Sequence, residues 1–350
     1  MIDFSKLLMV WYKQNKRDLP WRETKNPYNI WLSEIILQQT RVEQGLSYYL
    51  KFIEHYPTVN DLANAHEEEV LKLWQGLGYY SRARNLHFTA KEIVQHHQSK
   101  FPKTLKEIKN LKGIGDYTAA AILSFSHNKP YPVIDGNVYR VLSRVFGVKD
   151  FIDSSKGQNV FKVLAEELID KKNPAMYNQA IMEFGAIHCK PKLPLCESCC
   201  FQYNCYAFKN NEINNLPKKE KQTKQRSRFF NYLVITDEKE IIINKRTEKD
   251  IWTGLFDFPL IETTKSIEDF EKVVTKDYRW LLKKENIVTK SDEFIHQLSH
   301  QRIHAVFWKI KTSPLKKIET THIITSINTL ESYPVPKLVE NYIKSLLQNL

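Results

Sequence analysis

Cysteine is scarce in this 350-residue sequence, and its five copies all lie within the 17 residues from Cys189 to Cys205. Long apolar runs are also missing, so we expect no membrane span, which needs roughly 20 consecutive apolar residues. The N-terminus has no basic region ahead of a long apolar core and no small-residue cleavage site, so it does not resemble a signal peptide. We therefore expect a cytoplasmic protein, in a compartment where disulfides are rare.

Glycine and proline number only 10 and 14, which excludes collagen-like and low-complexity chains. An apolar fraction of 42% excludes wholesale disorder, and 350 residues are comfortable for two domains. Lys and Arg together number 52 against 40 Asp and Glu, giving a net charge of +12. This balance favours a polyanion as partner, although a basic surface without a partner would have the same composition.

The first two-thirds of the sequence has helical periodicity and no strand pattern. The predicted helices cover residues 5–16, 30–49, 67–74, 104–111, 117–125, 138–146, 155–168 and 174–187. Residues 216–228 hold six basic residues and one acid, which predicts an exposed linker. Beyond it, alternating apolar residues predict strands at 229–236, 241–245 and 302–311, followed by a helix at 335–350. We therefore expect an all-α domain over 1–215, a basic linker, and a separate α+β domain over 229–350.

Four of the five cysteines have the spacing Cys-x6-Cys-x2-Cys-x5-Cys and are the candidate metal ligands: Cys189, Cys196, Cys199 and Cys205. Four thiolates suit either tetrahedral zinc or an iron–sulfur cluster, and ligand chemistry alone does not choose between them. Cys200 is next to Cys199 and cannot readily share its geometry, so we expect it to be the odd one out.

A Gly-x-Gly turn at Gly113 and Gly115 separates two predicted helices. Glycine allows a positive φ and a close backbone approach, and the second helix then presents free amides that can bind a phosphate. An ordinary helix–helix turn is the alternative. Asp116 would repel a phosphate but would serve well as an N-cap.

Two carboxylates have surroundings that suggest chemistry. Six of the eight residues from Ile30 to Leu37 are apolar, so we expect Glu34 to be partly desolvated and hence a proton donor near neutral pH, although an exposed helical Glu is the simpler alternative. Asp135 precedes a predicted helix, which makes it an N-cap or a carboxylate held for chemistry beside Asn137. Gln39 and Thr40 follow the Glu34 segment and carry groups able to bond base edges.

Together these segments resemble a known family. The hairpin LKGIGDYTAAAILS, the segment VIDGNVYRVLSR and the four-cysteine spacing resemble the helix-hairpin-helix DNA glycosylases with an iron–sulfur cluster. Within them, WLSEIILQQT, GLGYYSRARNL and the extra C-terminal domain resemble the MutY branch of adenine glycosylases. The resemblance implies an all-α helix-hairpin-helix glycosylase domain with a 4Fe-4S cluster loop at 189–205, and a Nudix-like α+β domain at the C-terminus.

The resemblance also implies the reaction. The expected substrate is double-stranded DNA with adenine mispaired with 8-oxoguanine or guanine, and the adenine leaves the base stack to enter a pocket. Glu34 would protonate the leaving adenine, and Asp135 would stabilise the oxocarbenium-like sugar, as carboxylates do in glycosidases. Tyr117 and Asn137 would orient Asp135 or line the pocket, and Gln179 lies in YNQAIMEFGA, where the family contacts the adenine.

Further residues are implied to read the lesion. Gln39 and Tyr79 match residues that wedge into the base stack, although Tyr79 could equally belong to the core. Ser299 and His300 match the family's lesion-reading loop, in which Leu298 replaces the usual Phe. The clustered acids of Nudix hydrolases are absent after Pro259, which predicts recognition without pyrophosphohydrolysis.

Tyr117 stands where the endonuclease III branch has a lysine that forms a Schiff base. A phenol cannot form an imine, so we expect base removal without efficient strand cleavage. The alternatives are an oxidised-pyrimidine glycosylase and lyase, against which Tyr117 and the extra domain argue, and a non-catalytic DNA-binding protein, against which Glu34 and Asp135 argue. We expect a monomer that works in the bacterial cytoplasm, on the nucleoid.

Overall fold

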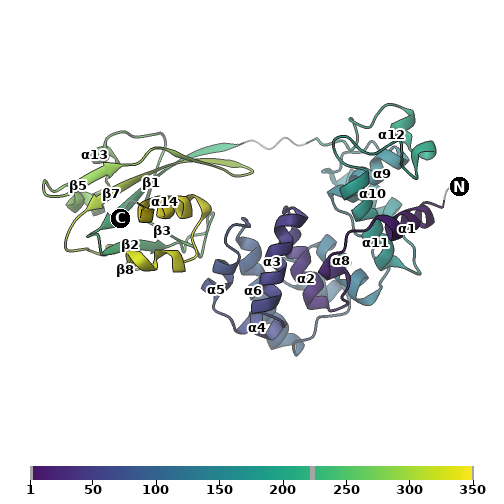
Figure 1. The fold of residues 1–350 in the computed structure, drawn as a ribbon, viewed down its shortest axis with the longest axis horizontal. Coiled ribbons are helices and arrows are strands. Elements are labelled where there is room, and N and C mark those ends of the chain that lie inside the picture. Colours follow the sequence, from purple (N-terminus) through teal and green to yellow (C-terminus); the bar gives the residue numbers. More distant parts are fainter. Residues whose placement is uncertain (1–2, 221–224, 349–350) are drawn as a thin grey trace. The chain divides into compact units, whose positions relative to one another are not determined.

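A computed structural model describes residues 3–220 and 225–348. The chain forms two compact units, one of Met1–Asn64 and Asn85–Lys221, the other of Ala65–Arg84 and Gln222–Leu350 (Figure 1). The sequence was expected to keep residues 1–215 together, whereas residues 65–84 pack with the C-terminal part of the chain. No helix among the described residues is long and apolar enough to cross a membrane.

The first unit is helical, and its described residues contain no strand. Its helices are α1 (Phe4–Asn15), α2 (Pro27–Leu37), α3 (Val42–His55), α4 (Val59–Asn64), α7 (Leu105–Asn110), α8 (Asp116–His127), α9 (Gly136–Phe146), α10 (Ser155–Leu168), α11 (Pro174–Glu183) and α12 (Tyr206–Lys209), together with the greater part of α6 (Ser81–His97). Short 3-10 turns lie at Pro20–Arg22 and Gln202–Asn204, and a π-helical turn at Phe184–His188 follows α11.

The single helix expected over 30–49 is wrong, because the chain turns between α2 and α3. Gln39 adopts a left-handed backbone with φ of 57°, and the Thr40 amide donates to the carbonyl of Leu37 at 3.2 Å. A turn made by Gln-Gln-Thr without glycine or proline carries no strong sequence signal. The break places the end of α2 and the turn residues at the rim of a cavity.

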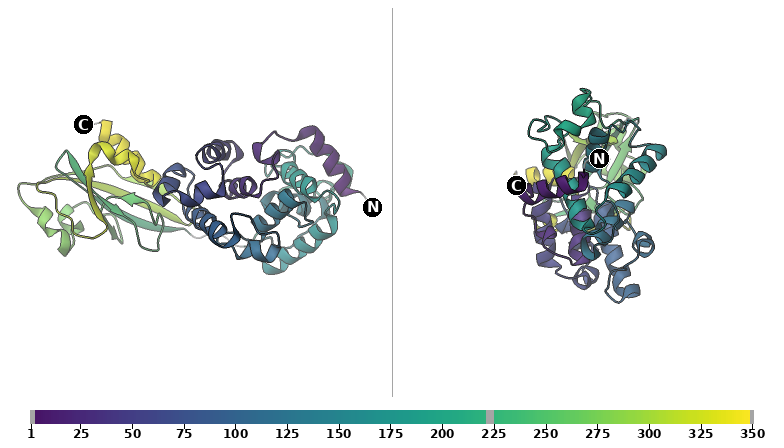
Figure 2. Two further views of the ribbon diagram at one scale, coloured as in Figure 1. Left: turned by 90° about the horizontal axis from the view of Figure 1, so that it is seen from below. Right: turned by 90° about the vertical axis from the view of Figure 1, so that its right-hand side faces the viewer.

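Helix α1 forms because apolar residues recur at helical spacing and Asp3 caps its start, accepting from the Lys6 amide at 3.1 Å. Its buried face packs against α11 in a core cluster that also contains residues of α9. The ribbons of Figures 1 and 2 show α1 lying beside α11. Phe4 stacks on Phe201 with ring centroids 4.7 Å apart. The packing of α1 on α11 joins the first helix of the chain to one that begins some 170 residues later.

The expected exposed linker at 216–228 is partly ordered. Leu216 is buried, and the carbonyl of Lys218 accepts from the Ile152 amide at 3.1 Å. The final residues of the expected linker belong to a strand that begins at Arg226, and Arg228 is buried in ion pairs with Asp250 and Glu262. Residues 221–224 lie outside the described part of the chain.

The second unit contains a mixed sheet. Its strands are β1 (Arg226–Thr236), β2 (Glu240–Lys245), β3 (Phe256–Asp257), β4 (Leu260–Thr263), β5 (Ile287–Lys290), β6 (Phe294–Gln297), β7 (Gln301–Lys311) and β8 (His322–Ser326), and its helices include α5 (Glu67–Leu73), α13 (Phe270–Val273) and α14 (Lys337–Gln348). Strands β1 and β7 run parallel at the centre of the order β3-β2-β1-β7-β5.

Both faces of this sheet are covered. Phe307 stacks on Tyr342 of α14 at 3.9 Å between centroids, whereas the next residue, Trp308, packs against Phe270 of α13 at 5.3 Å. Successive strand residues point to opposite faces, so the two helices lie on opposite sides of the sheet. The expectation of an α+β domain in the C-terminal part of the chain is confirmed.

Candidate active site

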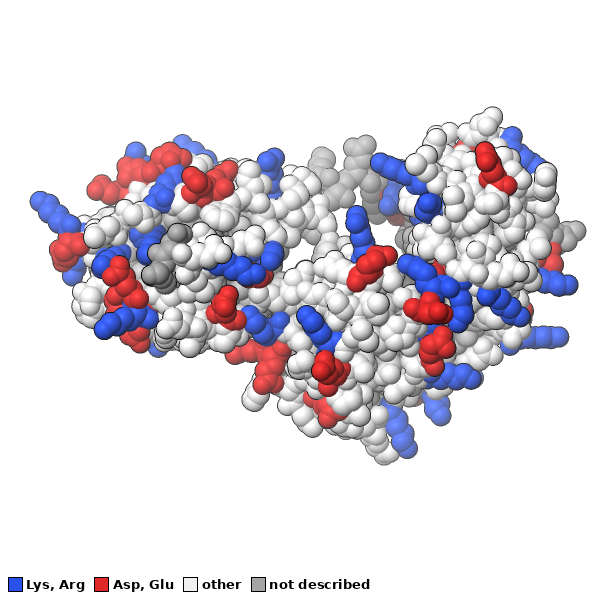
Figure 3. Space-filling view, viewed as in Figure 1, with Lys and Arg blue, Asp and Glu red and all other residues white. Residues whose placement is uncertain are grey.

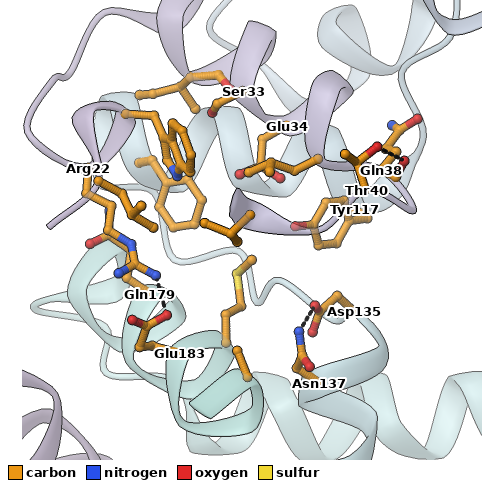
Figure 4. Close-up of a pocket in the computed structure, with 18 of the residues that line it drawn as sticks. Arg22, Ser33, Glu34, Gln38, Thr40, Tyr117, Asp135, Asn137, Gln179 and Glu183 are labelled. Carbon is orange, nitrogen blue, oxygen red and sulfur yellow. Dashed lines mark hydrogen bonds and ion pairs between the residues drawn. The ribbon is translucent and has the colours of Figure 1, made fainter. Parts of the chain in front are cut away.

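A cavity of about 500 Å³ opens in the helical unit, a size typical of small-molecule sites. Its walls come from the segment after α1, from α2 and the turn that follows, and from α8, the start of α9 and α11. Figure 4 shows Glu34 on one wall with Tyr117 beside it, and Asp135 and Asn137 on the facing wall. All four residues expected to take part in catalysis therefore line one cavity.

Glu34 is buried rather than exposed on its helix. Helix α2 is apolar on nearly all of its faces and is therefore buried inside the unit. Glu34 is buried with it and is only 6% exposed. Burial raises the pKa of the Glu34 carboxyl to about 7; a hydrogen bond from Tyr117 opposes this rise, and the charge of Asp135 adds to it. The carboxyl can therefore hold a proton near neutral pH and donate it into the cavity.

Tyr117 interacts with the carboxylates on both walls of the cavity, Glu34 and Asp135. Its position in the first turn of α8 brings the hydroxyl to Glu34, with which it shares a hydrogen bond. Burial, followed by the charges of Glu34 and Asp135, raises the pKa of this phenol well above its usual value. Tyr117 is therefore a neutral hydrogen-bond donor at physiological pH.

Asp135 both caps a helix and lines the cavity. It is the N-cap of α9, and its Oδ1 accepts from the Val138 amide at 2.8 Å. Its Oδ2 accepts from Asn137 Nδ2 at 2.7 Å and faces the cavity (Figure 4). Burial raises the pKa of Asp135, and these hydrogen bonds act against that rise. These two hydrogen bonds therefore hold the Asp135 carboxylate in one position at the start of α9.

The buried Glu34 makes folding stability depend on pH. The folded state keeps the Glu34 proton up to about pH 7, whereas an ordinary carboxyl releases it near 4.5. The stability that is present below the lower value is lost as pH rises through the higher one, and about 2 to 3 kcal/mol of it is lost between pH 5 and pH 8. We expect urea unfolding to show the Glu34→Gln variant gaining that amount over the wild type between pH 5 and pH 8. An equal difference at both pH values would contradict a raised pKa.

The other residues predicted for substrate contact separate into two sets. Gln39, Thr40 and Gln179 line the same cavity as the two carboxylates. Gly113 and Gly115 do not line it; they form the hairpin between α7 and α8.

The conformation of the hairpin requires glycine at Gly113 but not at Gly115. Gly113 has φ of +80°, and a Cβ there would meet Asn85 Cβ at 2.9 Å. Gly115 has an extended backbone with open space around it, so it does not use the positive φ that glycine allows. Asp116 is the first residue of α8 rather than its cap, and it forms an ion pair with Lys109. That pairing offsets a charge that would otherwise repel a phosphate.

Sequence reasoning missed a charged cluster at the far side of the cavity. Glu183 is only 1% exposed on its side chain, and it accepts from Arg17 Nη2 at 2.8 Å and Arg22 Nη2 at 2.7 Å. Burial alone would raise the pKa of Glu183, but the two arginines lower it to about 2. The available signal was the same as for Glu34, because Glu183 is an acid among apolar residues of α11.

Tyr79, Ser299 and His300 belong to the second unit. Tyr79 is 41% exposed with φ of 48°, which rules out the core alternative for its side chain. Its hydroxyl forms a hydrogen bond with Ser299. Ser299 and His300 are exposed in the turn between β6 and β7, where the Leu298 amide donates to the Gln301 carbonyl at 2.8 Å.

The cysteine-rich segment surrounds a small cavity of its own. Its lining contains the four cysteines expected as ligands, and Cys200 is not among the lining residues. Two buried arginines contact Cys189: Arg144 Nη1 donates to Cys189 Sγ at 3.5 Å, and Arg140 Nε donates to the Cys189 carbonyl at 2.8 Å. Such cations suit a site that holds several thiolates.

Among the described residues, no three His, Cys, Asp or Glu side chains are close enough to bind one metal ion together. Four thiols that line one cavity are a donor set that fits a metal centre held by cysteine, either a tetrahedral zinc or an iron–sulfur cluster.

Comparison with known proteins agrees with this architecture. Residues 32–167 match the HhH-GPD superfamily of base excision DNA repair proteins, and residues 231–345 match the NUDIX domain. An adenine DNA glycosylase of Buchnera aphidicola subsp. Schizaphis graminum is 33% identical over 349 residues, which cover 97% of this chain and 98% of that one. This chain belongs to the adenine DNA glycosylase family.

Other relatives and solved structures match a smaller share of the chain. The adenine DNA glycosylase of Rattus norvegicus is 42% identical over 213 residues, covering 58% of this chain and 41% of that one. A solved thermostable thymine-DNA glycosylase is 29% identical with a TM-score of 0.55, covering 59% of this chain and 95% of its own. An endonuclease III–DNA complex, at 22% identity and a TM-score of 0.52, covers 59% and 94% and shares the fold.

Proposed function

We propose that this protein hydrolyses the N-glycosidic bond of adenine mispaired with 8-oxoguanine or guanine in double-stranded DNA. As a member of the adenine DNA glycosylase family it is a base excision repair enzyme. The observation that carries the proposal is the cavity in which a buried Glu34, with a pKa of about 7, faces the carboxylate of Asp135, the N-cap of α9. A proton donor opposite a carboxylate is the pairing that glycoside hydrolysis requires.

In this mechanism, adenine leaves the base stack and enters the cavity. Glu34 protonates the base, which turns adenine into a better leaving group as the glycosidic bond breaks. Asp135 stabilises the positive charge that develops on the sugar, and Asn137 holds the carboxylate through its 2.7 Å hydrogen bond. Tyr117 donates a hydrogen bond to Glu34. Its phenol cannot form an imine, the reaction for which a lysine amine is needed.

DNA binding is supported by the hairpin and the second unit. The backbone of the hairpin glycines and the free amides at the start of α8 can bind a phosphate of the DNA backbone. In the second unit, Tyr79 and Ser299 share a hydrogen bond, and we assign them with His300 to the opposite strand and its lesion. Figure 3 shows basic and acidic side chains interspersed on the face in view, so the net charge alone does not mark the DNA-binding surface.

We also propose that Cys189, Cys196, Cys199 and Cys205 hold a 4Fe-4S cluster, because all four line one cavity beside buried arginines. When bound, the cluster would supply a covalent clamp for the loop from 189 to 205 and no chemistry in the Glu34 cavity. Cys200 lies outside that cavity lining and is not a ligand in this proposal.

The proposal predicts glycosylase activity without lyase activity. End-labelled duplexes would carry either adenine opposite 8-oxoguanine or an oxidised thymine, and each would be run on a gel with and without alkali. We expect cleavage of the adenine strand after alkali only, and no adduct trapped by borohydride, because Tyr117 cannot form an imine. Cleavage of the oxidised-thymine duplex without alkali would instead identify a lyase, and binding without base release would identify a recognition protein.

A further inference from the structure

A buried hydroxyl lies directly behind one residue of the cavity wall. Tyr12, on α1, is 5% exposed and does not line the cavity. Its hydroxyl donates to Gln179 Oε1 at 2.8 Å, across 167 positions of sequence. We propose that Tyr12 is a positioning residue that fixes the Gln179 amide, so that the base in the cavity meets an N–H donor. This inference rests on the proposed function and specifies how the same site reads its substrate.

The direction of this hydrogen bond sets the polarity that Gln179 offers. A glutamine amide has one acceptor oxygen and one donor NH2 group, and rotation by 180° exchanges them. Because Tyr12 engages the oxygen, the NH2 group is left for a ligand. Adenine has ring nitrogens that accept hydrogen bonds and one exocyclic amine that donates. A fixed Gln179 therefore reads a ring nitrogen of adenine rather than its amine.

The surroundings of Tyr12 hold its ring still. Helix α1 packs on α11, the helix that carries Gln179, and Tyr12 belongs to the core cluster between them. The guanidinium carbon of Arg22 lies 5.8 Å from the Tyr12 ring centroid, and Arg22 is itself paired with Glu183. Burial raises the pKa of Tyr12, more than Arg22 lowers it, so the hydroxyl keeps its proton throughout the neutral range. The donor is therefore both fixed in place and always protonated.

The test removes the hydroxyl and keeps the ring. We expect Tyr12→Phe to lower the single-turnover rate of adenine release from an adenine:8-oxoguanine duplex about three- to ten-fold, the effect of one hydrogen bond. The affinity for the duplex should not change, because phosphate contacts dominate it. The matched control is Tyr177→Phe on α11, which removes a buried hydroxyl that has no hydrogen-bond partner among the described residues. It should release adenine at the wild-type rate.

A double-mutant cycle separates positioning from a structural role. If Tyr12 acts through Gln179, then Tyr12→Phe should cause no further loss in a Gln179→Ala background. An equal loss in both backgrounds, or no loss from Tyr12→Phe alone, would overturn the inference while leaving the glycosylase activity in place. Failure of the wild-type protein to release adenine would overturn the proposed function, and this inference with it.

Discussion

Replacing Glu34 by Gln should reduce the single-turnover rate of adenine release by about 10² to 10⁴, the range typical of a lost general acid. The substitution keeps the size of the side chain and its ability to accept from Tyr117, but it removes the proton that the buried carboxyl holds near pH 7. Release would be measured by chromatography of free adenine after mixing excess enzyme with an adenine:8-oxoguanine duplex.

The matched control for this variant is its binding to the same duplex. Because Glu34 is 6% exposed and makes no part of the hairpin, we expect Glu34→Gln to bind the duplex as tightly as the wild type. Tight binding with no release would also separate the enzyme from a recognition protein, in which both forms would bind and neither would react. Full release by Glu34→Gln would show that another group donates the proton.

The Asp135→Asn variant should lose about 10² to 10³ of the rate, because a neutral amide stabilises the positive sugar far less than a carboxylate. Asn is as good an N-cap as Asp, so the Val138 amide keeps its acceptor and α9 should remain folded. The rate would be measured as for Glu34→Gln, with thermal melting to check the fold.

The control for Asp135 is the Asn137→Ala variant, which removes the 2.7 Å hydrogen bond and keeps the carboxylate. We expect a loss of about ten- to 100-fold, since a hydrogen bond to a charged group contributes about 1.5 to 3 kcal/mol. A larger effect from Asn137→Ala than from Asp135→Asn would reverse the roles assigned to the two residues.

Local sequence was sufficient for the residues whose neighbours determine their environment. Glu34 could be predicted to be desolvated because the helix around it is apolar on every side. Asp135 could be predicted as a cap because it directly precedes a helix. The four cysteines that line one small cavity were marked by their spacing, and Cys200, which does not line it, was set apart by its adjacency to Cys199.

Contacts between distant segments could not be predicted in this way. The Tyr12–Gln179 hydrogen bond joins two helices 167 positions apart, and nothing in either helix identifies the other. The pairing of Glu183 with Arg17 and Arg22 depends on the same packing of α1 against α11. The break after α2 was missed because Gln39 takes a left-handed conformation, which is uncommon for residues other than glycine.

The central claim is that a protonated Glu34 drives removal of adenine. The most direct test is the single-turnover rate of adenine release by the wild-type protein from an adenine:8-oxoguanine duplex between pH 5 and pH 9. Since Glu34 must carry its proton and its pKa is about 7, the rate should fall about tenfold for each pH unit well above 7. A rate that stays constant or rises from pH 7 to pH 9 would contradict the claim.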